Sequence, residues 1–425
     1  MWKKIGRAAA VAAACLSLAS GAEAQGRPEC LGTITRASIV PCALEASLDV
    51  RAERAGVDAL EGRRVASGAL LPANPVLALS GGTRSSASES ATNWYATLSQ
   101  EIEVAGQRSS RARAADAALA AQRERLLLGK RDAAALAWSA FFEALAAREQ
   151  LRLADRLLAT SERMAVVARA RADEGVAATL DADLADAATL RLLKSKLAAE
   201  RSVATANARL ALLVLGREPS AGLAVEGALT PLPGLDARAE TADVSRRPEV
   251  RATEAEERAS SYRAEALRRS RVPNPTVSAF AQNDGFSERV FGLGVAIPIP
   301  LPPPVGRTYA GEIAEADALA RQASIERSRV ERGLRLELAE AHAAYTAHRL
   351  ALEAMTPERL ARAAESLREL EVEIEAGRVG VREALVAQQT LIELLQTEIA
   401  ARRALCLASV RLARALGLPL EEGLR

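Results

Sequence analysis

Apolar residues recur every three to four positions along most of the chain, as Trp138, Phe141 and Leu145 illustrate. That spacing is typical of one buried face of an α-helix. No proline occurs between 107 and 173, so the pattern predicts one helix over 107–173, which at about 1.5 Å per residue would extend about 100 Å. Such a length favours coiled-coil packing, although ordinary core stripes in a helical bundle would show the same spacing.

A glycine and then a returning helix follow each long helix. In the first half, Gly175 precedes a predicted return helix over 178–215. In the second half, a long helix over 308–376, with Pro357 as its one interruption, precedes another glycine and a return helix over 382–416. Glycine adopts positive φ without strain and can therefore end a helix in a tight reversal. The sequence thus predicts two antiparallel helical hairpins per chain.

The two halves of the chain repeat the same order of elements. Asn74-Pro75 recurs as Asn274-Pro275, and Gly175 recurs as Gly377. We therefore predict an internal duplication. The expected organisation is an N-terminal segment over 25–43, two repeats over 44–216 and 248–417 that each begin with a helix, a linker rich in proline and glycine over 217–247, and a tail over 418–425.

Strict alternation of large apolar and small residues marks 290–298, where Phe291, Leu293 and Val295 alternate with glycine or alanine. Alternation with a period of two predicts a β-strand. Weaker versions predict strands over 76–82, 93–100 and 276–282, with polar loops between the paired strands. A sheet with large apolar residues on one face and small residues on the other suits a wall between lipid and a lumen.

Four strands do not close a membrane barrel, and an open sheet edge in hydrocarbon leaves backbone N–H and C=O groups without partners. After the first 24 residues the chain has no apolar stretch that reaches the roughly 20 residues of a spanning helix. If the sheet enters a membrane, three copies with four strands each would give a closed barrel of twelve. A trimer is the simplest closed solution. The alternative is a small soluble sheet that caps a helical bundle.

The N-terminus has the pattern of a secretory signal peptide over 1–24. Lys3, Lys4 and Arg7 precede an apolar run over 8–19, and Ala22-Glu23-Ala24 forms a cleavage site before Gln25. The apolar run is too short for a retained membrane anchor. Lipidation at Cys15 is a further alternative.

Exported chains meet an oxidising compartment, in which neighbouring thiols tend to pair. Cys30 and Cys42 are natural disulfide partners ahead of the first helix, and two free thiols in a mobile segment are the alternative. Cys406 falls on an apolar helical face with Ile399 and Val410, so we expect it to be buried as a small hydrophobic residue.

The composition excludes several classes of function. With 56 basic against 54 acidic residues, the net charge of +2 does not indicate a nucleic-acid partner. His342 and His348 are the only histidines, and a six-residue separation places them on different sides of a helix. The chain shows no Cys-His cluster, glycine-rich phosphate loop or catalytic triad spacing. We therefore predict no enzyme activity, no cofactor and no bound metal.

These features together resemble the TolC-like outer-membrane factor family, the outer membrane efflux proteins, over nearly the whole mature chain. The resemblance rests on the paired Asn-Pro strand entries, on "LSQEIEVAGQR" (98–108) and "AIPIPL" (296–301) before the long helices, and on the glycine-marked tips. Within the family, the stretch 273–301 is most similar to the cobalt-zinc-cadmium resistance branch.

The resemblance implies a mainly α fold with a small β part. It implies a homotrimer with a twelve-stranded barrel in the outer membrane of a Gram-negative bacterium, a periplasmic α-helical barrel, and an equatorial belt that includes 217–247. The implied partners are a periplasmic adaptor (membrane fusion) protein, a resistance-nodulation-division type inner-membrane pump and outer-membrane lipid. Arg108, Arg111 and Arg113 lie where the barrel would meet the long helix and are candidates for lipid contact, or form a solvated face.

The resemblance also locates a periplasmic gate near the start of the returning helices. Its acidic positions match Glu383 and, one turn later, Val386, so one acid of the pair is replaced by an apolar residue. The matching acids of the first half are Asp181 and Asp186. A ring of Glu383 carboxylates would attract cations. Alternatively, Glu383 is a solvated acid that the helix dipole favours.

The tips of the two hairpins are the expected contact with the adaptor. The candidate contact residues are small or aliphatic: Gly175, Val176, Gly377, Val379 and Gly380. Turn formation alone would also explain the glycines.

The expected function is the exit duct of a tripartite efflux system that exports heavy-metal cations. The alternatives are a type I protein secretion duct, an organic-compound efflux duct, and a soluble periplasmic coiled-coil scaffold.

Overall fold

The computed structural model describes residues 30, 32–85, 89–216, 223–239, 243–283, 288–301, 304–305, 308–376 and 378–422. The predicted signal peptide over 1–24 and the predicted tip residue Gly377 lie outside the described residues.

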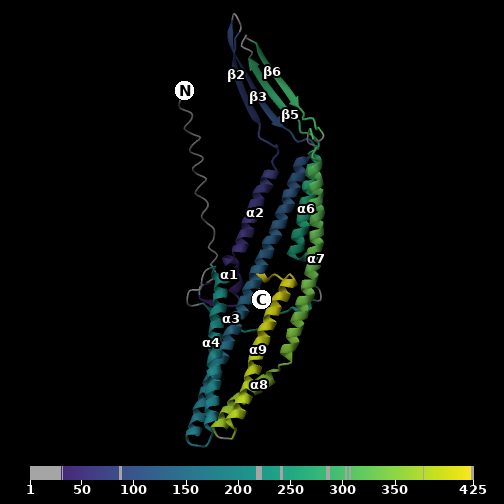
Figure 1. Ribbon diagram of the computed structural model, residues 1–425. Coiled ribbons are helices and arrows are strands. Elements are labelled where there is room, and N and C mark those ends of the chain that lie inside the picture. Colours follow the sequence, from purple (N-terminus) through teal and green to yellow (C-terminus); the bar gives the residue numbers. More distant parts are fainter. Residues whose placement is uncertain are drawn as a thin grey trace.

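The described part of the chain is mainly helical and elongated, with a sheet at one end and two helical reversals at the other (Figure 1). α3 runs from the sheet to the tips and packs against helices from both halves of the sequence. The main helices are α2 (Leu48–Ser67), α3 (Gln107–Asp173), α4 (Thr179–Leu215), α6 (Pro248–Arg269), α7 (Ala310–Glu353), α8 (Pro357–Glu375) and α9 (Val381–Ala415).

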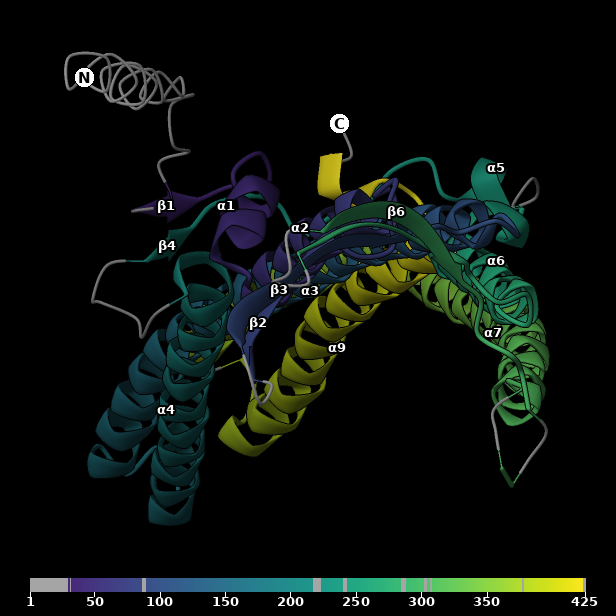
Figure 2. The same ribbon diagram turned by 90° about the horizontal axis from the view of Figure 1, so that it is seen from above.

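Near the sheet, α2, α3, α6 and α7 form a curved layer in that order, because α2 packs on α3, α3 on α6 and α6 on α7. Seen from above, the layer is concave on one side, and the short elements α1 (Ile39–Ala46), β1 (Thr33–Ile34), β4 (Ala224–Val225) and α5 (Asp236–Ala239) lie on its convex side (Figure 2). Nearer the tips, α4 and α9 pack against α3.

The second long helix differs from the prediction of a single helix over 308–376. α7 ends at Glu353 and α8 begins at Pro357. Proline has no backbone N–H and is therefore accommodated at the first position of a helix, not in its interior. Thr356 precedes it, and its side-chain oxygen accepts a hydrogen bond from the backbone N–H of Arg359 at 3.4 Å. This cap starts a new helix, so the predicted long helix over 308–376 consists of two helices, divided next to Pro357, the interruption that the sequence marks.

The first helical segment begins earlier than the predicted repeat boundary at 44. α1 starts at Ile39, inside the predicted N-terminal segment 25–43, and Pro41 occupies its first turn. A proline there removes no helical hydrogen bond. Ser47 is extended (φ −64°, ψ 119°) and its side chain caps α2 by accepting a hydrogen bond from the backbone N–H of Val50. The chain therefore bends at Ser47, between α1 and α2.

The sheet has the order β2-β3-β5-β6, and every neighbouring pair is antiparallel. Its strands are β2 (Val76–Ser85), β3 (Ser90–Glu101), β5 (Thr276–Asn283) and β6 (Arg289–Ala296). The first hairpin is longer than the predicted strands 76–82 and 93–100, because pairing with β3 continues beyond Gly82 to Ser85. The last strand ends at Ala296 and not at 298; Pro298 has no N–H to donate to a ladder.

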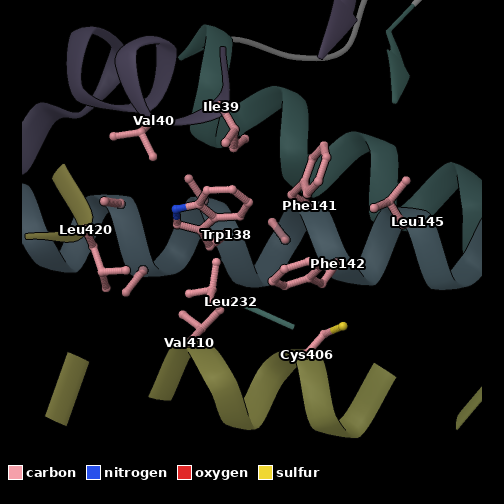
Figure 3. Packing of buried hydrophobic residues seen from close by; sticks show 14 of the residues in the cluster. Ile39, Val40, Trp138, Phe141, Phe142, Leu145, Leu232, Cys406, Val410 and Leu420 are labelled. Carbon is pink, nitrogen blue, oxygen red and sulfur yellow. The ribbon is translucent and has the colours of Figure 1, made fainter. Parts of the chain in front are cut away.

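The main core lies midway along α3, beside the short elements of the convex side. Trp138, Phe141 and Phe142 are fully buried, and their rings pack against one another (Figure 3). Cys406 of α9 is part of the same core. Burial raises the pKa of its thiol to about 12, so the thiol stays protonated at neutral pH.

A disulfide between Cys30 and Cys42, whose Cα atoms are 5.7 Å apart, ties residue 30 to α1.

Candidate functional site

The first tip is the reversal between α3 and α4. Gly175 has φ +73°, a conformation that residues with a side chain adopt only with strain. The backbone N–H groups of Val176 and Ala177 both donate to the carbonyl of Arg171, at 2.9 and 3.1 Å. These bonds satisfy a carbonyl that the helix end would leave unpaired. Val176 itself is exposed at the end of the molecule.

The second tip is the reversal between α8 and α9. Arg378 donates two hydrogen bonds to the carboxylate of Glu373, both at 2.7 Å, and this contact lowers the pKa of Glu373. Val379 is half-buried against Met164 of α3 and Ala384 of α9. Only part of the Val379 side chain is therefore available to a partner, while Gly380 is exposed.

An ion pair joins the two hairpins close to their tips. Asp181, in the first turn of α4, accepts a hydrogen bond at 2.9 Å from Nε of Arg382, in the first turn of α9. Asp186 pairs within the first hairpin with Arg169 of α3. Both predicted gate acids of the first half thus have basic partners in the single chain. Figure 1 shows the two tips side by side.

The two predicted gate residues of the second half are exposed to solvent. Glu383 is exposed, and it has no ion pair or hydrogen bond anywhere in the described part of the chain. Val386, one turn later, is 69% exposed. A carboxylate without a cationic partner keeps its full negative charge for an approaching ion. Of the three predicted gate acids, Glu383 is therefore the one without a basic partner within the described residues.

Arg382 and Arg169 were not among the residues that the sequence singled out. Arg382 is 201 positions from Asp181, and the pattern of either segment alone does not indicate the pair. The duplication contained the only signal, because it places the first turns of the two returning helices at equivalent positions. In both turns, a charged residue occurs near the start of the helix.

The sheet has two faces of different character. Pairing places Leu79, Ala96, Ala281 and Phe291 in one row and Leu77, Leu98, Ala279 and Leu293 in another, and both rows lie on one face because alternate residues of a strand share a face. Leu293 is 82% exposed. The other face carries many small or polar residues, such as Ser80, Thr97 and Ser278, among a few large ones. The ring of Phe280 on this face fills the space beside Gly292.

Within the described residues, the strands β2 and β6 each have a neighbouring strand on one side only. An exposed apolar face and unpaired edges are unfavourable in water.

Within the described residues, no helix is both long and apolar enough to span a membrane. That same part of the chain contains no group of three or more residues that could hold a metal ion.

Comparison with known proteins gives a consistent result. A search of curated proteins found no match. Among solved structures, CusC has a TM-score of 0.74 at 18% identity, with 90% of this chain and 92% of CusC covered. The open state of the MtrE outer membrane channel of Neisseria gonorrhoeae has a TM-score of 0.74 at 18% identity, with 92% of this chain and 90% of the MtrE chain covered. VceC, an outer membrane protein of Vibrio cholerae, has a TM-score of 0.71 at 16% identity, with 90% of this chain and 96% of VceC covered.

The model of the outer membrane efflux protein family matches residues 39–216 and 244–418, one segment for each repeat. These segments include the sheet with its apolar face and both hairpin tips. Members of this family are transport ducts and not enzymes, and their location is the outer membrane. The chain therefore belongs to the outer membrane efflux protein family.

Proposed function

We propose that three copies of this chain form an exit duct through the outer membrane. The observation that carries the proposal is the four-stranded sheet, which has a continuous apolar face and two edges without partners. Joining β2 of one copy to β6 of the next satisfies both edges, and three copies then contribute twelve strands to a closed barrel.

The helical layer supports the same assembly. Its outer helices, α2 and α7, each have a helical neighbour on one side only near the sheet. They carry exposed apolar residues, among them Val65 on α2 and Ile325 on α7. Contact between α2 and α7 of neighbouring copies would bury such residues and continue the helical layer into a tube.

Location and assembly are tested together. The full chain, expressed in a Gram-negative host, is expected in the outer-membrane fraction, with a mass of three copies after mild detergent extraction. Recovery in the soluble periplasm would support the scaffold alternative. A monomer in detergent that preserves native assemblies would refute the trimer.

We infer further that the hairpin tips meet a periplasmic adaptor and, through it, an inner-membrane pump of the resistance-nodulation-division type. Val176 and Gly380 are exposed at the tips, and Val379 is partly so. Site-specific cross-linking from Val176 tests the contact. The expected product contains the adaptor, whereas the same probe at Val65, far from the tips on α2, should give no product with the adaptor.

Heavy-metal cations are the proposed substrates. The support is the likeness of 273–301 to the cobalt-zinc-cadmium resistance branch, together with the unpaired carboxylate of Glu383. Discrimination among metals is then a task of the pump. Loss of the chain from its host should raise sensitivity to cobalt, zinc or cadmium. Raised sensitivity to organic compounds alone would favour an organic-compound efflux duct. Loss of a secreted protein from the culture medium would favour a type I secretion duct.

A further inference from the structure

A pocket of about 300 Å³ lies between α2, α3 and α6, on the sheet side of the main core. One arginine from each helix lines it: Arg63 of α2, Arg111 of α3 and Arg263 of α6. The hydroxyl-bearing Ser67 also lines the pocket, and apolar residues form the rest of its wall: Ala114, Ala115 and Ala118 of α3, and Ala266 and Leu267 of α6. No acidic residue is among the lining residues.

Two of these arginines have no acidic partner. Arg111 is paired with Glu103 at 2.6 Å, and the Glu103 side chain is only 8% exposed. Arg63 and Arg263, by contrast, form no ion pair and no hydrogen bond within the residues that the structure describes. Neighbouring arginines are compensated: Arg64 pairs with Asp116 at 2.6 Å.

Arg63 and Arg263, the two arginines without an ion pair, repel each other electrostatically. Partial burial lowers the pKa of Arg263, and the positive charge of Arg63 lowers it further. The carboxylates of the adjoining pocket, Glu256 and Glu326, are already paired with Arg125 and Arg329. The repulsion between Arg63 and Arg263 is therefore not relieved by a nearby acid of the described chain.

The pocket opens on the concave side of the helical layer. Trp138 follows Ala118 by 20 positions (138 − 118), which is about five and a half turns at roughly 3.6 residues per turn, so the two lie on opposite faces of α3. Trp138 packs against the short elements on the convex side (Figures 2 and 3). Leu136, five turns after Ala118, is 51% exposed, as expected for the concave face.

We propose that this pocket binds a small, doubly charged oxyanion such as hydrogen phosphate. A guanidinium group offers paired N–H donors whose spacing matches two oxygens of such an ion. Arg63 and Ser67 of α2 provide donors on one side and Arg263 of α6 on the other, and the alanines of α3 leave room for the ion. The site is complete in a single chain. In the proposed trimer it would face the lumen.

Calorimetric titration of the full chain in detergent with inorganic phosphate, at constant ionic strength in chloride, tests the proposal. Saturable binding with a dissociation constant on the order of 1 mM is expected for a solvent-accessible site. Arg63→Gln and Arg263→Gln should each weaken binding by about tenfold or more. Arg64→Gln is the matched control, since it removes the same charge from the next position of α2 on the other face and should change affinity by less than about twofold.

Arg263→Lys provides a second variant in case a glutamine variant does not fold. It keeps the charge and loses the paired donors, so its affinity should lie between those of the wild type and Arg263→Gln. Sulfate should compete with phosphate. An absence of saturable binding by the wild type would overturn the proposal, as would equal losses in Arg263→Gln and Arg64→Gln. Neither result bears on the location or stoichiometry of the duct, which fractionation and mass measurements decide.

Discussion

A substitution on the apolar face of the sheet tests whether that face meets lipid. Leu293 lies near the middle of β6, opposite Ala279, and is 82% exposed in the single chain. Leu293→Arg would place a charge against hydrocarbon, which near the middle of a bilayer destabilises an inserted barrel by about 2 to 4 kcal/mol per substitution. Since about 1.4 kcal/mol is a factor of ten, this corresponds to roughly a 30- to 1,000-fold shift away from the inserted state for each copy.

Ser278→Arg is the matched control for Leu293→Arg. Ser278 precedes Ala279 in β5 and therefore lies at nearly the same height on the opposite face, beside Gly294. The assay is the fraction of chain that resists urea extraction from isolated outer membranes at equal expression. We expect a large loss for Leu293→Arg and a small one for Ser278→Arg. If Leu293→Arg inserts like the wild type, or the two losses are equal, the assignment of this face to lipid is wrong.

Three further substitutions test the N-terminus and the tips. Cys30→Ser should destabilise the attachment of the N-terminal segment by about 3 kcal/mol, because the bond to Cys42 closes a short loop; faster proteolysis of this segment is the measure, and an unchanged rate would contradict it. Asp181→Asn and Arg382→Gln should each raise single-channel conductance in planar bilayers, since each breaks the same contact of about 0.2 to 1 kcal/mol. The conductance of the double variant should equal that of each single variant, and a larger, additive increase would show that Asp181 and Arg382 do not act as a unit. Glu383→Gln should reduce cation preference in reversal potentials, and an unchanged preference would exclude Glu383 from the ion path.

Helices were the most predictable part of the fold. α3 occupies Gln107–Asp173, the predicted range, because the absence of proline and the regular apolar spacing act over many turns. The break between α7 and α8 depends instead on a few local groups. Thr356 followed by Pro357 is a helix start signal. The prediction marked Pro357 as an interruption but kept one helical range over 308–376, since a proline can either kink a helix or end it.

Contacts between distant segments were less predictable. Residues 83–85 were assigned to the polar loop after the predicted strand 76–82, but pairing with residues 90–92 keeps them in β2. The Arg63 and Arg263 pocket likewise depends on how α2, α3 and α6 are placed side by side. Single-segment patterns contain no information on such neighbours. Only the duplication gave partial information on such contacts, because it relates equivalent positions of the two halves.

The arginine pocket and Glu383 place opposite charges at distant levels along the helices. From Ala118 in the pocket wall to Gly175 at the tip, α3 and its cap span 57 positions (175 − 118), or about 85 Å at roughly 1.5 Å per residue. Electrostatic interactions are screened within about 8 Å at physiological ionic strength. In the proposed duct, Glu383 and the two pocket arginines would therefore act on a passing ion independently. A cation drawn to Glu383 at the entrance would reach the level of the arginine pocket only after it had travelled most of the helical section, and there a bound oxyanion would neutralise the two arginines.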